Sequence, residues 1–157
     1  MEIKRETIGS YILIKNEIMW IKAHLSHWLP YLDQMVFFDG NSTDGTIEVI
    51  EEFERNHPQG NRIHLYLNRD PDDLKDSYMR LFDECLHSLS TDWALFNHPD
   101  MIPENPEILE EFLSNSRSHI AAFTHMKSYA GEPGGQLYEI RTGRIDRWKQ
   151  IERLKSP

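Results

Sequence analysis

Short apolar runs alternate along this chain with segments that repeat apolar residues every three or four positions. The short runs predict strands, because a run of four to eight apolar residues is typical of a strand buried on both faces. The run after Arg62 alternates apolar and polar residues and predicts a strand with one face in solvent. The predicted strands are Ser10–Lys15, Met35–Phe38, Arg62–Leu67, Trp93–Phe96, Ile120–Thr124 and Leu137–Arg141, followed by a polar, basic tail.

The segments between these runs have helical spacing. In the first, Ile18, Ile21, Leu25 and Trp28 form one apolar stripe. Strands alternating with helices predict one α/β domain over residues 1–157 with a largely parallel sheet. The predicted helices run from about Glu17 to Pro30, from Asp44 as N-cap to Asn56, from Asp72 to Leu89, and from Pro106 to Asn115, where Ile108 is expected to face inward.

Polar residues stand directly after three of the predicted strands. These residues are Asn16, Asp39 and Asp100. In open α/β sheets, ligands gather outside the carboxyl ends of the strands, so we expect the three side chains to share one crevice.

The segment Phe37–Thr46 joins an apolar strand to a helix through a loop of small polar residues. Its hydroxyls, its backbone N–H groups and the positive end of the following helix suit phosphate or sugar hydroxyls. Asp39 could also cap a turn, but the surrounding loop favours ligand binding, and Asp44 has the simpler interpretation of a helix cap. Asn16 and Glu17 fit an ordinary helix start as well as a ligand site.

The charge balance narrows the classes of partner. The 157 residues carry 17 Lys and Arg against 26 Asp and Glu, a formal net charge of -9. This argues against binding bulk nucleic acid or an anionic membrane, both of which favour a basic face. The single cysteine, Cys85, excludes an internal disulfide and matches a reducing compartment. With no signal peptide and no apolar stretch of about 20 residues, the chain is expected to be soluble and cytoplasmic.

Several of these residues recur in order in one enzyme family. Ile14–Glu17, then Trp20, His24, Asp39 and Ser42–Thr46, resemble the nucleotide-sugar half of family 2 glycosyltransferases with the GT-A fold. The resemblance implies a Rossmann-like three-layer sandwich, with a mostly parallel sheet between helices. It covers about residues 1–100, the nucleotide-binding half, and leaves 101–157 as a shortened acceptor side.

The family's pattern implies roles for particular residues. Asn16, Glu17 and Asp39 would hold the nucleotide base and ribose, and the Ser42–Thr46 loop, with Ser42 and Asp44, would shape that pocket. Thr91–Phe96 resembles the strand before the family's Asp-x-Asp, whose carboxylates bind a divalent metal and through it the sugar diphosphate. At that place this chain has His98-Pro99-Asp100, in which Asp100 aligns with the second acid.

The resemblance implies a divalent metal, Mn²⁺ or Mg²⁺, bound by Asp100 and His98. The imidazole of His98 would suit Mn²⁺ better than Mg²⁺. His98 also fits a structural role, in which one ring hydrogen bond orders the loop. Trp20, Trp28 and Trp93 are expected in the core rather than as sugar platforms. The acids available as catalytic base for the acceptor are Glu139 and Asp146.

Two functions from different classes follow from the resemblance. In the first, the chain binds a nucleotide-diphospho-sugar, a UDP-sugar above others, and transfers the sugar to an acceptor hydroxyl with inversion. In the second, a non-catalytic relative keeps nucleotide-sugar binding and acts as a binding or assembly module. An uncovered apolar patch near the fifth strand would also favour a homo-oligomer.

Overall fold

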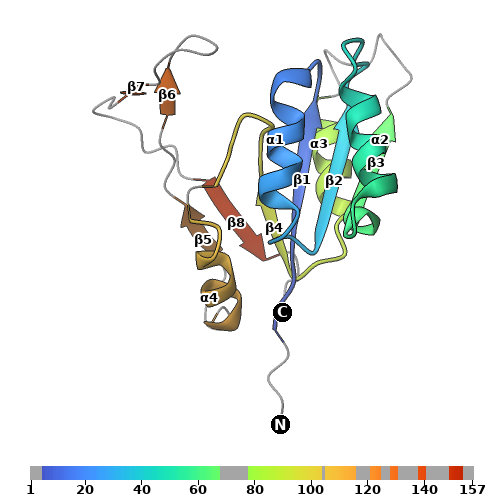
Figure 1. The fold of residues 1–157 in the computed structure, drawn as a ribbon. Coiled ribbons are helices and arrows are strands. Elements are labelled where there is room, and N and C mark those ends of the chain that lie inside the picture. The colour runs from blue at the N-terminus through green and yellow to red at the C-terminus, as the bar shows by residue number, and fades with distance from the viewer. Residues whose placement is uncertain are drawn as a thin grey trace.

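The structure is a computed structural model that describes residues 5–67, 78–103, 105–115, 121–124, 128–130, 138–140 and 149–153. These residues form a mixed α/β fold (Figure 1). The elements are β1 (Ile8–Ile14), α1 (Ile18–Trp28), β2 (Gln34–Asp39), α2 (Thr46–Asn56), the 3₁₀ turn η1 (Gly60–Arg62), β3 (Ile63–Leu67), α3 (Tyr78–His87), β4 (Trp93–Phe96), α4 (Ile108–Asn115), β5 (Ala121–Thr124), β6 (Ser128–Ala130), β7 (Tyr138–Ile140) and β8 (Lys149–Arg153).

The main sheet has six strands in the order β3-β2-β1-β4-β8-β5. Strands β1 to β4 are mutually parallel, whereas β8 runs antiparallel to both of its neighbours. Ile14 pairs with Asp39, and Tyr11 pairs with Phe96, so the carboxyl ends of β1, β2 and β4 meet at one edge of the sheet. The predicted α/β class with a mostly parallel sheet is confirmed.

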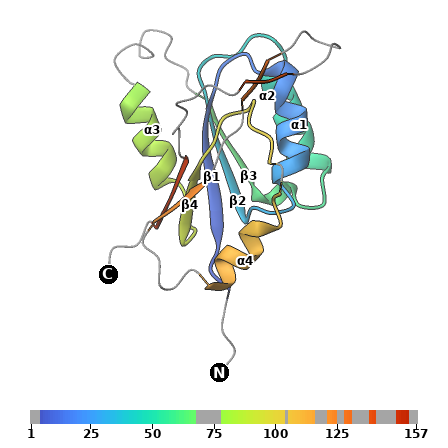
Figure 2. The same cartoon turned by 90° about the vertical axis from the view of Figure 1, so that its left-hand side faces the viewer.

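Helices cover both faces of the sheet (Figure 2). The larger hydrophobic core lies between the sheet and the helices α1 and α2. In it, Ile12, Leu25 and Phe37 have no exposed surface. The opposite face packs against α3, where Cys85 is buried beside Val36. Burial raises the pKa of the Cys85 thiol to about 12, so this side chain is a neutral core residue, as its setting in the sequence suggested.

One strand was not predicted. β8 lies in the segment expected to be a polar, basic tail, yet it pairs with β4 on one side and β5 on the other. Its sequence, Lys-Gln-Ile-Glu-Arg, has a single apolar residue, Ile151, and therefore no alternating pattern. Backbone pairing with two neighbours defines this strand.

Several side chains expected to face inward are exposed instead. Trp20 is 47% exposed, Ile18 is 39% exposed and Ile108 is 61% exposed. Each lies in the first turn of a helix. Helical spacing predicted Ile18 and Ile108 to be buried, and Trp20 was expected in the core together with the other tryptophans. Leu67, at the end of the outermost strand β3, is also open to solvent. Trp93 is fully buried and Trp28 is half-buried, as expected.

No helix in the described part of the chain is both long enough and apolar enough to cross a membrane. The longest described helices, α1 and α2, have 11 residues each. At about 1.5 Å per residue, such a helix covers roughly half of the bilayer's hydrocarbon core.

Ser10 provides a test of how the β1 core is packed. Its side chain is fully buried, and its Oγ has no hydrogen-bond partner among the described residues. A buried polar group without a partner costs about 1–3 kcal/mol. We therefore expect Ser10→Ala to raise the free energy of unfolding in urea by about 1 kcal/mol.

Thr91 supplies the matched control, because its buried Oγ1 donates to the Trp93 carbonyl at 2.8 Å. Thr91→Val removes that hydrogen bond and should lower the free energy of unfolding. Destabilisation by Ser10→Ala of similar size to that by Thr91→Val would contradict the assignment of Ser10 as an unsatisfied group.

Candidate functional site: the carboxyl edge of the parallel strands

The turn between β1 and α1 is bonded to the loop between β2 and α2. Three consecutive backbone N–H groups in the turn are accepted by three side chains of the loop. The pairs are Asn16 N with Ser42 Oγ at 2.9 Å, Glu17 N with Thr46 Oγ1 at 2.8 Å, and Ile18 N with Asp44 Oδ2 at 3.0 Å. We call this set the interloop lock. It satisfies donors that the start of α1 leaves without intrahelical partners.

Asn16 completes the lock from the other side. Its Oδ1 accepts the Thr43 N–H at 2.8 Å, and its backbone has a positive φ of 57°. Asparagine tolerates this left-handed conformation better than most residues. The side chain predicted to hold a nucleotide is thus engaged in joining the two loops.

The sequence predicted Asp44 as the N-cap of α2, but Gly45, whose φ is 97°, holds that position directly before Thr46. The Asp44 carboxylate still accepts the N–H and Oγ1–H of Thr46, the first residue of α2. It also accepts the first N–H of α1, from Ile18. Desolvation acts to raise the pKa of Asp44, but these hydrogen bonds outweigh it, so the net pKa lies below the ordinary value.

Asp39 ends β2 and is 2% exposed. Both of its carboxylate oxygens lie near the Ser42 N–H, at 3.2 and 3.0 Å. This contact matches the turn-capping interpretation of Asp39. Through Ser42, Asp39 belongs to the same network as Asn16, and little of its surface is left for a ligand.

The segment His98-Pro99-Asp100 forms a turn. The Met101 N–H donates to the His98 carbonyl at 3.0 Å, which places Pro99 and Asp100 at the two central positions. Pro99 is buried and Asp100 is exposed. The His98 ring packs edge-on against Phe96, with ring centroids 4.7 Å apart. The turn therefore presents the Asp100 carboxylate to solvent.

Acidic groups from three segments meet at this edge. The pKa of Glu17 is raised, first by burial and then by the negative charges of Asp100 and Asp44. Glu17, half-buried at the start of α1, is thus within electrostatic reach of the exposed acid of the turn. The structure brings these predicted site residues into one corner of the molecule.

A divalent cation fits the chemistry of this corner, because carboxylate oxygens are the ligands that Mg²⁺ and Mn²⁺ prefer. Among the described residues, no group of three or more His, Cys, Asp or Glu side chains could hold a metal ion. The described residues would therefore supply one or two ligands. The remaining ligands would come from phosphate oxygens and water.

Two predicted site residues are not placed at this corner. Glu139 lies in β7, which pairs with β6 outside the main sheet, and its side chain is outside the described part. Asp146 also lies outside the described residues. Their predicted role as catalytic base stays a prediction.

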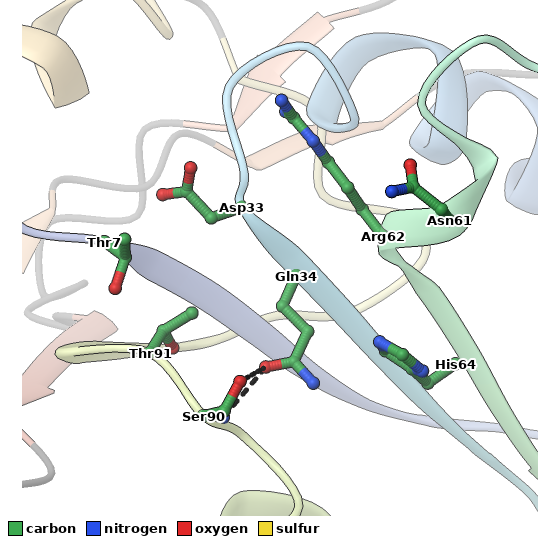
Figure 3. Close-up of a pocket in the computed structure, with 8 residues that line it drawn as sticks. All are labelled: Thr7, Asp33, Gln34, Asn61, Arg62, His64, Ser90 and Thr91. Atoms are coloured by element: carbon green, nitrogen blue, oxygen red, sulfur yellow. Dashed lines mark hydrogen bonds between the residues drawn. The ribbon is translucent and has the colours of Figure 1, made fainter.

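A cavity of about 370 Å³ lies at the opposite, amino end of the strands (Figure 3). Sequence analysis named none of its residues as a site. Gln34 Oε1 accepts the Ser90 N–H at 2.8 Å and lies 3.2 Å from Ser90 Oγ, and Asp33 accepts the Ile8 N–H. Gln34 thus joins the α3–β4 loop to β2, and Asp33 joins β1 to the residue before β2. The lining residues are Thr7, Asp33, Gln34, Asn61, Arg62, His64, Ser90 and Thr91.

Comparison with solved structures supports the fold. A mannosyltransferase from Pyrobaculum calidifontis, in complex with GDP-Man and Mn²⁺, aligns with a TM-score of 0.60 at 16% identity. The alignment covers 76% of this chain and 35% of that protein. A 4-diphosphocytidyl-2C-methyl-D-erythritol synthase aligns with a TM-score of 0.47 at 14% identity, over 97% of this chain and 76% of that chain. This second likeness is weak.

No protein-family model matches the chain, and no curated protein matches it. At 16% identity, the likeness to the mannosyltransferase shows the fold alone. The fold is GT-A-like, with four parallel strands flanked by helices, as the sequence resemblance implied.

Thr46 tests whether the interloop lock stabilises the fold. Thr46→Val keeps the shape of the side chain but removes the acceptor for the Glu17 N–H and the donor to Asp44. We expect the free energy of unfolding in urea to fall by about 1–3 kcal/mol. Thr43→Val is the control, because Thr43 is exposed and joins the lock through its backbone N–H. A change of less than about 0.5 kcal/mol is expected for that variant, and equal losses in both would argue against the lock.

Glu17 should make stability depend on pH. Because its pKa is raised in the folded state, its contribution to stability is present below the unfolded pKa of about 4 and is lost as the pH rises through the folded pKa. Glu17→Gln should therefore raise the melting temperature relative to wild type at pH 7, and this gain should disappear near pH 3.5. Glu52→Gln, which removes a carboxylate at an exposed position on α2, is the control and should leave the melting temperature close to that of the wild type.

Proposed function

We propose that this chain binds a nucleotide-diphospho-sugar at the carboxyl edge of β1, β2 and β4, as a relative of the family 2 glycosyltransferases. The observation that carries the proposal is that Glu17 and the exposed Asp100 follow β1 and β4, whose carboxyl ends meet with that of β2 at one edge of the sheet. Two acids held near each other destabilise the ligand-free protein, and a cation bound with a diphosphate relieves their repulsion. The GT-A-like fold supports the same edge as the ligand site.

The family resemblance supports the following roles for the residues of this edge. Asn16, Glu17 and Asp39 would border the base and ribose, and Ser42 and Asp44 would shape the pocket through the interloop lock. Asp100, with His98 beside it, would contact a divalent ion, Mn²⁺ or Mg²⁺, together with the diphosphate oxygens. When bound, the ion would neutralise charge on the leaving diphosphate.

The proposed reaction transfers the sugar to an acceptor hydroxyl with inversion at the anomeric carbon. A carboxylate base must take the proton of that hydroxyl, and Glu139 or Asp146 would fill the role. The competing function is nucleotide-sugar binding without turnover. The replacement of the first acid of the family's metal motif by His98 favours this second function.

Thermal unfolding with UDP, GDP, UDP-glucose and GDP-mannose, each with and without Mn²⁺, tests the proposal. A ligand at about 100 times its dissociation constant adds roughly 2.7 kcal/mol of stability. We expect at least one nucleotide-sugar to raise the melting temperature, and more so with Mn²⁺. Asp100→Asn should remove the Mn²⁺-dependent part of the shift. Asp83→Asn, an exposed carboxylate on α3 across the sheet, should keep it.

The results separate the two functions. Stabilisation followed by release or transfer of the sugar supports the transferase, and stabilisation without turnover supports the binding module. If the correctly folded protein shows no shift with any nucleotide, both functions are wrong.

A further inference from the structure

Trp28, in the last turn of α1, contacts the turn that carries Asp100. Its indole Nε1 donates to the Met101 carbonyl at 2.6 Å, across 73 positions of sequence. The indole is half-buried and packs near His24, with ring centroids 6.3 Å apart. From the sequence, Trp28 was expected in the core and in no further role.

The hydrogen bond fixes one end of the turn. The Met101 N–H closes the turn on the His98 carbonyl, and the Met101 carbonyl is held by Trp28. Both backbone polar groups of Met101 therefore have partners. The other end of the turn is anchored to the sheet, through the contact of His98 with Phe96 and the contact of Phe96 with Tyr11.

The same helix begins beside Glu17 and ends with Trp28. The interloop lock fixes the start of α1, because it accepts the N–H groups of Glu17 and Ile18. A helix of 11 residues is stiff over its length of roughly 16 Å. The place of the Asp100 turn relative to Glu17 is thus set through one rigid element, provided that the Trp28 hydrogen bond is made.

We infer that Trp28 is a positioning residue, which holds the Asp100 turn against α1 and so fixes where the Asp100 carboxylate can meet a divalent cation. This inference rests on the proposed function, since the cation is the one that would accompany the nucleotide-sugar. Trp28 itself touches neither ligand. It acts through Met101, by restricting the positions that the Asp100 carboxylate can take.

Trp28→Phe is the informative variant, because it removes the N–H donor and keeps an aromatic ring beside His24. Trp93→Phe is the matched control. The Trp93 indole donates to Glu6 Oε2 at 2.7 Å, and its ring packs against Phe112, so this variant loses an equivalent hydrogen bond away from the proposed site.

Two measurements are made on each variant. Amide hydrogen exchange at Met101 reports whether the turn has loosened, and calorimetric titration of the better nucleotide-sugar, with and without Mn²⁺, reports the Mn²⁺-dependent part of the affinity. For Trp28→Phe we expect faster exchange at Met101 and roughly tenfold weaker Mn²⁺-dependent affinity, as found for groups that orient metal ligands. Mn²⁺-independent affinity should be unchanged, and Trp93→Phe should leave both measurements as in the wild type.

The outcomes distinguish this inference from the proposed function. Faster exchange at Met101 with Mn²⁺-dependent affinity within twofold of wild type would overturn the positioning role and leave the proposed function standing. Equal losses of affinity in the two variants would also overturn it, since they would reflect general destabilisation. A wild-type protein that binds no nucleotide-sugar in the presence of Mn²⁺ would overturn both.

Discussion

The backbone N–H groups at the start of α1 need acceptors, and the loop after β2 supplies them through Ser42, Asp44 and Thr46. The first N–H groups of a helix have no intrahelical acceptors, and the N–H of Glu17 is partly buried, so this exchange fixes where α1 begins and how the first two βα units meet. The position of Glu17 follows directly from it. The placement of the Asp100 turn follows through α1 and Trp28. The carboxyl edge of the sheet is therefore one bonded unit and not a set of independent loops.

This unit divides the polar residues of the edge into two kinds. Asn16, Ser42 and Asp44 hold the loops together. The carboxylates of Glu17 and Asp100 are not part of the interloop lock, and the pKa of Glu17 is raised, first by burial and then by the negative charges of Asp100 and Asp44. Acids kept in an unfavourable arrangement are typical of functional sites, where a bound ligand supplies the missing opposite charge. The amino-end cavity lacks this character, because side chains such as Gln34 and Asp33 already bond to neighbouring segments.

Local pattern was sufficient for the main elements. The apolar run Trp93–Phe96 was predicted with the bounds that the structure shows, and α1, α2 and β2 fell within two residues of theirs. Long-range partners were not accessible from the sequence. Local pattern predicted Asp44 as the cap of its own helix. It gave no sign that the carboxylate also accepts the N–H of Ile18, 26 positions away. The strand at Lys149–Arg153 has no alternating pattern and depends on pairing with β4 and β5. The positions of the candidate residues after the predicted strands were enough to predict that they lie at the carboxyl edge of the sheet. They did not show which of these side chains would be engaged in structural hydrogen bonds.

The location of the ligand is the most direct test of this account. Mn²⁺ bound with a nucleotide-sugar broadens the amide NMR signals of nearby residues, so a ¹⁵N spectrum maps its position. The account predicts broadening at Glu17, at Ser42–Thr46 and at Asp100–Met101, with the signals of Arg62, His64 and Ser90 at the amino-end cavity unaffected. Broadening centred on the amino-end residues, with sharp signals at Glu17 and Asp100, would contradict it.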